Sequence, residues 1–275
     1  SPRRGGFSAA VRQVAFSSDG KRLLTAGTSW LVGGGHGYHG GEVKLWDVES
    51  GKLVRRFGAV REAEYRYHEG GVEKVVPQGA VIRDGLSTST TIRSLACNAE
   101  LVAVGTHGAG GELPESGEVR IWNATTGDLV RTIVMKKVVP QGGWSPSVKA
   151  VALSADGRHV ATATAGRRYG TDEGRRADVR LWDIESGREV LALRGHETAV
   201  VAMTFSPDGR LLAAAGHDRV VRIWDTESGT RVAALPIPVM RINAVTFSPD
   251  GKLLAAGGGD EANRSRVQVW SCPTR

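Results

Sequence analysis

The sequence predicts an all-β fold assembled from repeated four-stranded antiparallel sheets. Three observations support this: a strand-like pentad built around tryptophan recurs along the 275 residues, alternating apolar runs precede each copy, and turns of Gly, Pro, Asp and Ser separate the runs. The five copies begin at Val43, Val119, Val179, Val221 and Val267. Because the copies recur in phase, they form an internal repeat that sets the architecture.

The fourth copy shows the order of elements most clearly. Apolar runs at 200–205 and 211–215 flank a Ser-Pro-Asp-Gly turn, and a third run at 220–224 contains the tryptophan. A fourth run at 231–235 follows a Ser-Gly turn. Alternation between such turns indicates antiparallel strands joined by tight connections. Four antiparallel strands in each unit predict a blade of a β-propeller.

The same order of elements divides the whole chain. We expect an N-terminal polar segment at 1–9, blade 1 at 10–57, a long loop insert at 58–91, blade 2 at 92–134, a loop at 135–147, blade 3 at 148–193, blade 4 at 194–235, and blade 5, which lacks its outer strand, at 236–275.

Residues 10–271 resemble the WD-repeat β-propeller family. The motifs that carry the resemblance are the Trp-Asp pairs at 46–47, 182–183 and 224–225, the Gly-His pair at 195–196, and the Ser-Pro-Asp-Gly turns at 206–209 and 248–251, which are similar to those of bacterial repeats. The resemblance implies a rigid ring of blades, and seven is the number of blades that it implies most often. It also implies a hydrogen-bonded tetrad of His, Asp, Ser or Thr, and Trp within a blade.

Only the fourth copy matches most of this tetrad. His196, Asp218 and Trp224 match, but Ala214 occupies the position of the hydroxyl residue. Most other copies lack the histidine. We therefore expect the remaining blades to rely more on apolar packing.

Five recognisable blades are fewer than the seven that the family implies. We expect the chain to be part of a seven-bladed ring that an upstream segment or a second polypeptide completes. An obligate interface of this kind buries upwards of about 2,000 Å². The alternative is a closed ring of five or six blades that uses the insert at 58–91 as filler.

The net charge of +7 raises the possibility of nucleic-acid binding. Basic residues recur two positions before four of the five tryptophans, and we expect them to face outward and to spread around the rim (Lys44, Arg120, Arg180 and Arg222). A nucleic-acid ligand is therefore not favoured. No apolar run is long enough to span a membrane, and we expect a cytoplasmic protein with no membrane partner.

Strand polarity places the long connections at one end of the ring, which we call the upper face. Six aromatic residues occur in these connections: Trp30, Tyr38, Tyr65, Tyr67, Trp144 and Tyr169. Such rings anchor many protein interfaces. We expect them to bind a protein or peptide ligand, with Arg167 and Arg168 steering an acidic partner. Packing of the rings beneath their own loops is an equally weighted alternative.

The sequence predicts no catalytic residues, no metal site and no cofactor. Residues 35–40 have the spacing of a dinucleotide fingerprint, but a strand follows them instead of the required helix. His36, His39, His68 and His107 could hold a metal only if the loops converged.

The main functional hypothesis is a non-catalytic interaction or docking module, and the sensor or regulatory part of a larger multidomain protein is one form that it could take. The alternatives are a propeller enzyme with a histidine or metal centre on the upper loops, and a basic nucleic-acid-binding surface.

Overall fold

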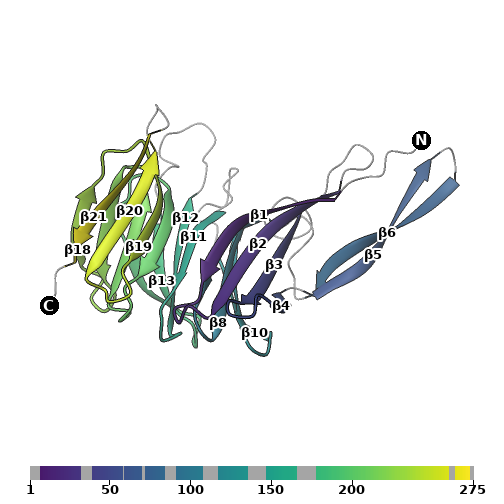
Figure 1. Cartoon of the computed structure of the whole chain (residues 1–275), viewed down its shortest axis with the longest axis horizontal. Coiled ribbons are helices and arrows are strands. Elements are labelled where there is room, and N and C mark those ends of the chain that lie inside the picture. The colour runs from purple at the N-terminus through teal and green to yellow at the C-terminus, as the bar shows by residue number, and fades with distance from the viewer. Residues whose placement is uncertain are drawn as a thin grey trace.

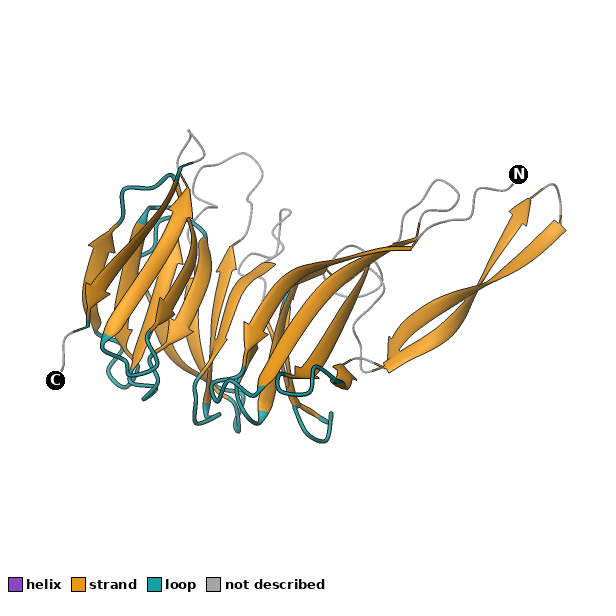
Figure 2. Cartoon of the chain, in the orientation of Figure 1, coloured by secondary structure: helices purple, strands orange, loops and turns teal. Residues whose placement is uncertain are grey.

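A computed structural model describes residues 7–31, 39–57, 59–69, 72–83, 91–107, 117–135, 147–165, 178–259 and 264–272 of the chain. It confirms the predicted all-β fold, because five antiparallel blades stand side by side as a β-propeller (Figure 1). All regular secondary structure in these residues is strand (Figure 2). They contain no helix long and apolar enough to cross a membrane.

Four blades have four strands in chain order, and the last blade has three. Blade 1 contains β1 (Phe7–Phe16), β2 (Arg22–Leu31), β3 (His39–Asp47) and β4 (Leu53–Phe57). Blade 2 contains β7 (Thr91–Cys97), β8 (Leu101–His107), β9 (Glu118–Asn123) and β10 (Leu129–Val134). Blade 3 contains β11 (Ser147–Leu153), β12 (His159–Ala165), β13 (Asp178–Asp183) and β14 (Glu189–Leu193). Blade 4 contains β15 (Val200–Phe205), β16 (Leu211–Gly216), β17 (Val220–Asp225) and β18 (Arg231–Pro236). Blade 5 contains β19 (Arg241–Phe247), β20 (Leu253–Gly259) and β21 (Ser265–Ser271).

Two segments differ from the expected division of the chain. β1 begins at Phe7, inside the segment expected to be a polar terminus. Most of the expected loop insert is an antiparallel hairpin, β5 (Ala59–Glu69) with β6 (Val72–Arg83), which projects beyond blade 1 in Figure 1. Two runs rich in valine or tyrosine flank a Gly-Gly pair in the sequence, and a two-residue Gly-Gly loop between strands is a hairpin signal, which accounts for the difference.

Short turns of one repeated design join the first and second strands of several blades. In blade 4, Ser206 Oγ donates a hydrogen bond to Asp208 Oδ1 at 2.5 Å and accepts one from the Leu211 amide at 2.9 Å. Gly209 completes the turn with a φ of 74°, a conformation that glycine adopts without steric cost. The hydrogen bond from Ser206 is the main cause that lowers the pKa of Asp208.

The first strands line the axis of the propeller, since each contacts the first strand of the next blade. Every one of them carries a register shift at the same height. A shift of this kind places one extra residue in the strand and leaves it outside the alternation. The bulge residues, in blade order, are Arg12, Arg93, Lys149, Val201 and Asn243.

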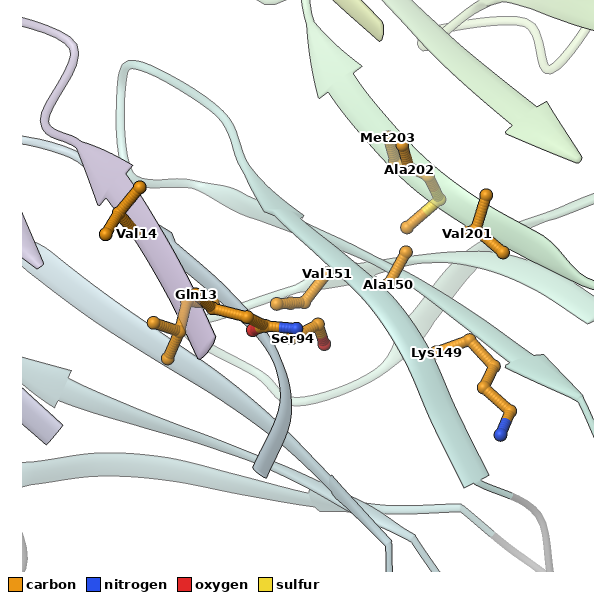
Figure 3. A pocket seen from close by; sticks show the side chains of 10 residues that line it. Gln13, Val14, Ser94, Lys149, Ala150, Val151, Val201, Ala202 and Met203 are labelled. Atoms are coloured by element: carbon orange, nitrogen blue, oxygen red, sulfur yellow. The ribbon is translucent and has the colours of Figure 1, made fainter. Parts of the chain in front are cut away.

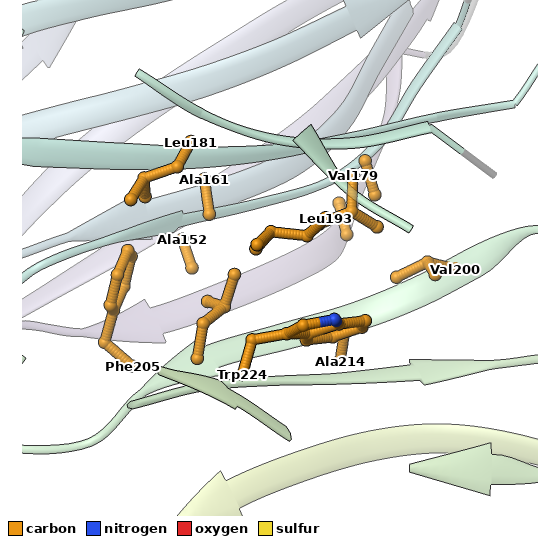
Figure 4. Close-up of a cluster of buried hydrophobic side chains, with 12 residues drawn as sticks. Ala152, Ala161, Val179, Leu181, Leu193, Val200, Phe205, Ala214 and Trp224 are labelled. Carbon is orange, nitrogen blue, oxygen red and sulfur yellow. The ribbon is translucent and has the colours of Figure 1, made fainter. Parts of the chain in front are cut away.

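Apolar packing between blades forms the core, and four buried clusters fill the four junctions between consecutive blades. Figure 4 shows the junction of blades 3 and 4, where Trp224 of blade 4 packs towards Val179 and Leu193 of blade 3. The tryptophan therefore faces the preceding blade. The residues one and three positions before it face the following blade.

These two faces are buried wherever a neighbour exists and are exposed at the ends. Val221 is 0% exposed, whereas Val267, at the same position of blade 5, is 73% exposed. Phe205 and Phe247 are both 8% exposed, whereas Phe16, their equivalent in blade 1, is 61% exposed. Within the described residues, no blade covers the outer face of blade 1 or of blade 5.

This difference predicts unequal costs for the same substitution at matched positions. Val221→Ala should lower the free energy of unfolding by about 2–3 kcal/mol, because it removes buried methyl groups and leaves a cavity. Val267→Ala should change it by less than about 0.5 kcal/mol in the isolated chain. Urea denaturation of both variants measures the two costs, and equal costs would contradict the exposed face of blade 5.

Candidate functional site

The tetrad that the family resemblance implies is divided between blades. In blades 1 and 3 the indole nitrogen donates to a threonine hydroxyl: Trp46 Nε1 to Thr25 Oγ1 and Trp182 Nε1 to Thr162 Oγ1, both at 2.9 Å. Sequence reasoning missed these bonds because it treated the four residues as one set. Strand register contains the signal, since Thr25 pairs with Lys44 and Thr162 pairs with Arg180, each two positions before the tryptophan.

Blade 2 has no threonine hydroxyl to accept a hydrogen bond from its tryptophan. Val104 pairs with Arg120 and so occupies the threonine position. The Nε1 atom of the buried Trp122 has no hydrogen-bond partner in the described structure. An unsatisfied buried donor is costly, so this blade lacks a stabilising contact that blades 1 and 3 possess.

Exchanging the two side chains tests this contact. Thr162→Val should lower the free energy of unfolding by about 1–2 kcal/mol, because Trp182 Nε1 loses its acceptor. Val104→Thr, the reverse change, should leave the melting temperature equal to or above that of the original chain, because Trp122 Nε1 gains an acceptor. Thermal and urea denaturation measure both. A Thr162→Val variant as stable as the original would show that the bond contributes nothing.

Blade 4 holds the other half of the tetrad, together with an arginine. His196 Nδ1 lies 3.1 Å from Asp218 Oδ2, and the His196 and Trp224 ring centroids lie 5.7 Å apart. Arg222 donates to Asp218 Oδ2 at 2.5 Å. The three sequence-predicted residues are thus brought together, and Arg222 joins them next to the position of Ala214.

The arginine corrects the expectation that the basic residues near the tryptophans face outward. Arg222 is 9% exposed, and the Arg120 side chain is 11% exposed. Residues two apart on a strand share one face. The basic residue therefore shares the face of the tryptophan, towards the preceding blade. In blades 2 and 3 it pairs with an acid on its own strand, Glu118 with Arg120 at 2.7 Å and Asp178 with Arg180 at 2.6 Å.

The buried cluster makes stability depend on pH. Burial alone raises the pKa of Asp218, but the hydrogen bond and charge of His196 and those of Arg222 outweigh it and lower the pKa to about 2. The carboxylate is therefore more acidic in the folded chain than in the unfolded chain. Its contribution to stability is complete above a pH of about 4 and is lost as the pH falls towards 2.

Asp218→Asn should lower the free energy of unfolding at pH 6 by about 3–5 kcal/mol, because it leaves the Arg222 guanidinium buried without a charge partner. The difference from the original chain should shrink as the pH falls from 4 to 2. Urea titrations at several pH values measure this. Asp128→Asn, on an exposed turn, is the control, and a difference that stayed constant with pH would contradict the assignment.

The described structure places only some of the expected partner-binding residues. Trp30 lies in β2, and Tyr65 and Tyr67 lie in β5. The others are outside the described residues: Tyr38, Trp144, Arg167, Arg168 and Tyr169. Their role on the upper face stays a prediction.

The possible metal ligands are placed in part. His36 lies outside the described residues, whereas His39, His68 and His107 lie in β3, β5 and β8. In the part of the chain that the structure describes, no group of three His, Cys, Asp or Glu side chains could hold a metal ion.

Two cavities occupy the central channel. One, of about 510 Å³, includes residues from all five first strands, Phe16 and Phe247 among them. The other, of about 340 Å³, lies towards the beginning of these strands and is lined by Gln13, Ser94 and Lys149 together with apolar residues (Figure 3). The channel is thus a hollow surface that could hold a ligand, in addition to the two exposed end faces of the arc.

Comparison with known proteins finds the same repeat. Residues 4–47, 187–225 and 236–271 match the family model of the WD40 domain, the G-beta repeat. The chain therefore contains WD40 repeats. Members of the family generally act as scaffolds that bind protein partners and are generally not enzymes.

The individual relatives are longer proteins. Coronin-7 of Mus musculus is 30% identical over 111 residues, covering 38% of this chain and 11% of its own length. Elongator complex protein 2 of Schizosaccharomyces pombe is 33% identical over 92 residues, covering 34% of this chain and 11% of its own length. The matched stretches thus span about a tenth of the length of these relatives. The relatives are eukaryotic, so the expected bacterial type of the repeats has no support.

A chain in the crystal structure of the mitotic checkpoint complex has the same fold. It superposes with a TM-score of 0.59 at 19% identity, covering 96% of this chain and 62% of that chain. At this identity the likeness concerns the fold alone.

Proposed function

We propose that this propeller is a non-catalytic protein-docking module whose principal docking surface is the pair of exposed end faces of its blade arc. The observation that carries the proposal is the exposure of residues whose equivalents are buried at every junction inside the arc. Val267 and Val269 are 73% and 54% exposed, while Val43, Leu45, Val221 and Ile223 are buried. An extended apolar surface of this kind is typical of a binding site.

Blade 5 also offers backbone hydrogen-bonding groups. In blades 1 to 4 the tryptophan-bearing strand pairs with a fourth strand, but β21 has no partner beyond β20 in the described structure. An unpaired edge is a template for strand addition. The strand that pairs there would be supplied by the partner.

The chemistry of the two ends specifies the occupant. The end face of blade 5 is of the kind that packs against the tryptophan face of a following blade, and the end face of blade 1 exposes Val14 and Phe16, which a preceding blade would cover. We therefore propose that the partner is a polypeptide carrying one or more further blades of the same type. The predicted seven-bladed ring would require two.

The wider context follows the relatives. Because they are several times longer than this propeller, we propose that it serves as one module, sensory or regulatory, of a larger assembly. The upper-face aromatic residues would add a second contact surface for a protein or peptide. Cytoplasmic localisation stays part of this proposal.

A photoreactive phenylalanine analogue at position 267 tests the docking surface in native cells. We expect it to crosslink to strands of another polypeptide, or of a separate segment of a longer chain, with the alternating apolar pattern of a blade. The analogue at position 269 should give the same product. Mass spectrometry of the crosslinked peptides identifies the occupant and separates the two sources.

Position 134 provides the control, since Val134 is an exposed valine on the outer strand of blade 2. The analogue there should give no such product. A folded chain whose positions 267 and 269 crosslink no more than position 134 would overturn the proposed docking surface.

A further inference from the structure

The smaller channel cavity contains polar groups that the fold leaves without partners. Ser94 is 6% exposed, and its Oγ atom has no hydrogen-bond partner in the described structure. The side-chain amide nitrogen of Gln13 donates to the Arg93 carbonyl, while Gln13 Oε1 is buried and unpartnered. Both side chains line the cavity from neighbouring first strands, as Figure 3 shows. A buried unsatisfied group is costly and requires an explanation, and a ligand that bonds to it is one.

Cationic groups accompany these atoms. Lys149 lines the cavity from the bulge of β11, and Arg93 occupies the equivalent bulge of β7. The pKa of Lys149 is lowered, first by burial and then by the charge of Arg93. No described carboxylate forms an ion pair with either residue. Two neighbouring cations without an acid favour the entry of an anion.

The bulge residues of blades 2 and 3 are the basic Arg93 and Lys149, whereas those of blades 4 and 5 are Val201 and Asn243. Ala202 and Met203 of β15 line the same cavity and form an apolar wall. A ligand that fits must therefore combine an anionic group with an aliphatic part.

We infer that this cavity binds the carboxylate side chain of an acidic peptide, with glutamate as the best fit. Lys149 forms an ion pair with the carboxylate, and Ser94 Oγ donates a hydrogen bond to it. The methylene groups of the side chain pack on the apolar wall. Gln13 Oε1 can only accept a hydrogen bond, and a peptide N–H supplies the donor that a fully ionised inorganic anion lacks.

This site shares Val14 with the end face of blade 1, but the groups proposed to bind the carboxylate lie outside both end faces, so the inference does not rest on the proposed docking of further blades. The carboxylate site lies among residues of β1, β7, β11 and β15, inside the channel. The variants that test it leave Val267 and β21 unchanged. Either proposal can fail while the other stands.

Protection of Lys149 from acetylation tests the inference directly. The intact chain is treated with an amine-acetylating reagent, with and without N-acetyl-triglutamate amide, and modification of each lysine is measured by mass spectrometry. We expect the peptide to slow modification of Lys149 by about fivefold or more and to leave Lys52, on an exposed turn, unchanged. Added salt should weaken the protection.

Three competing compounds define the ligand. N-acetyl-triglutamine amide should not protect Lys149, because it has no charge. Glutarate and inorganic phosphate should protect only at much higher concentrations, because they lack the peptide N–H. Equal protection by any of these compounds, or none by the glutamate peptide, would overturn the inference.

Variants provide a second measurement by titration calorimetry. Lys149→Gln and Ser94→Ala should each weaken binding of the triglutamate peptide, the first by about tenfold, which corresponds to about 1.4 kcal/mol. Lys149→Arg should retain most of the affinity, and Lys52→Gln is the matched control. Unchanged affinity in a folded Lys149→Gln chain would overturn the assignment, and the protection assay on the unmodified chain is independent of how the variants fold.

Discussion

Every blade has two apolar faces, and each face must be covered by another blade. This constraint explains why the tryptophan and the residues one and three positions before it recur so regularly: the indole covers the blade behind it, and the smaller side chains are covered by the blade ahead. It also explains why the ends differ from the middle. Val267 and Phe16 have the residue types of interior positions without the neighbour that those positions require.

The polar contacts follow a looser rule than the apolar ones. Thr25 and Thr162 bind the indole nitrogen in two blades, His196 and Asp218 form the other half of the tetrad in a third, and Trp122 has no partner in a fourth. Arg222 adds a charge that the sequence-derived tetrad does not contain. Apolar packing is common to all four junctions, whereas hydrogen bonds reinforce individual blades. Loss of one polar contact therefore need not disrupt the fold.

The sequence was sufficient to predict the blades, because alternation and tryptophan spacing are local patterns. The assembly of His196, Asp218 and Trp224 was predicted from the family resemblance. The sequence was less informative where partners are distant along the chain. The threonine acceptors depend on strand register, and the burial of Arg222 depends on the preceding blade, which covers the face that Arg222 shares with Trp224. The hairpin of β5 and β6 had a local signal, the Gly-Gly pair between runs rich in valine or tyrosine, that we read as part of a loop. The cavity beside Ser94 had none, because it is formed by strands from four blades.

Every first strand carries a bulge at the same height. This bulge separates the packing between blades, which restricts residue choice, from one position at which residue choice is free. A residue in the regular alternation must suit one of the packed faces, so its identity is restricted by volume and polarity. The extra residue of a bulge belongs to neither face, and Arg, Lys, Val and Asn all occupy it here. Mutation can therefore change the chemical character of the channel while the scaffold stays intact, which gives such proteins an evolutionary route to new ligands.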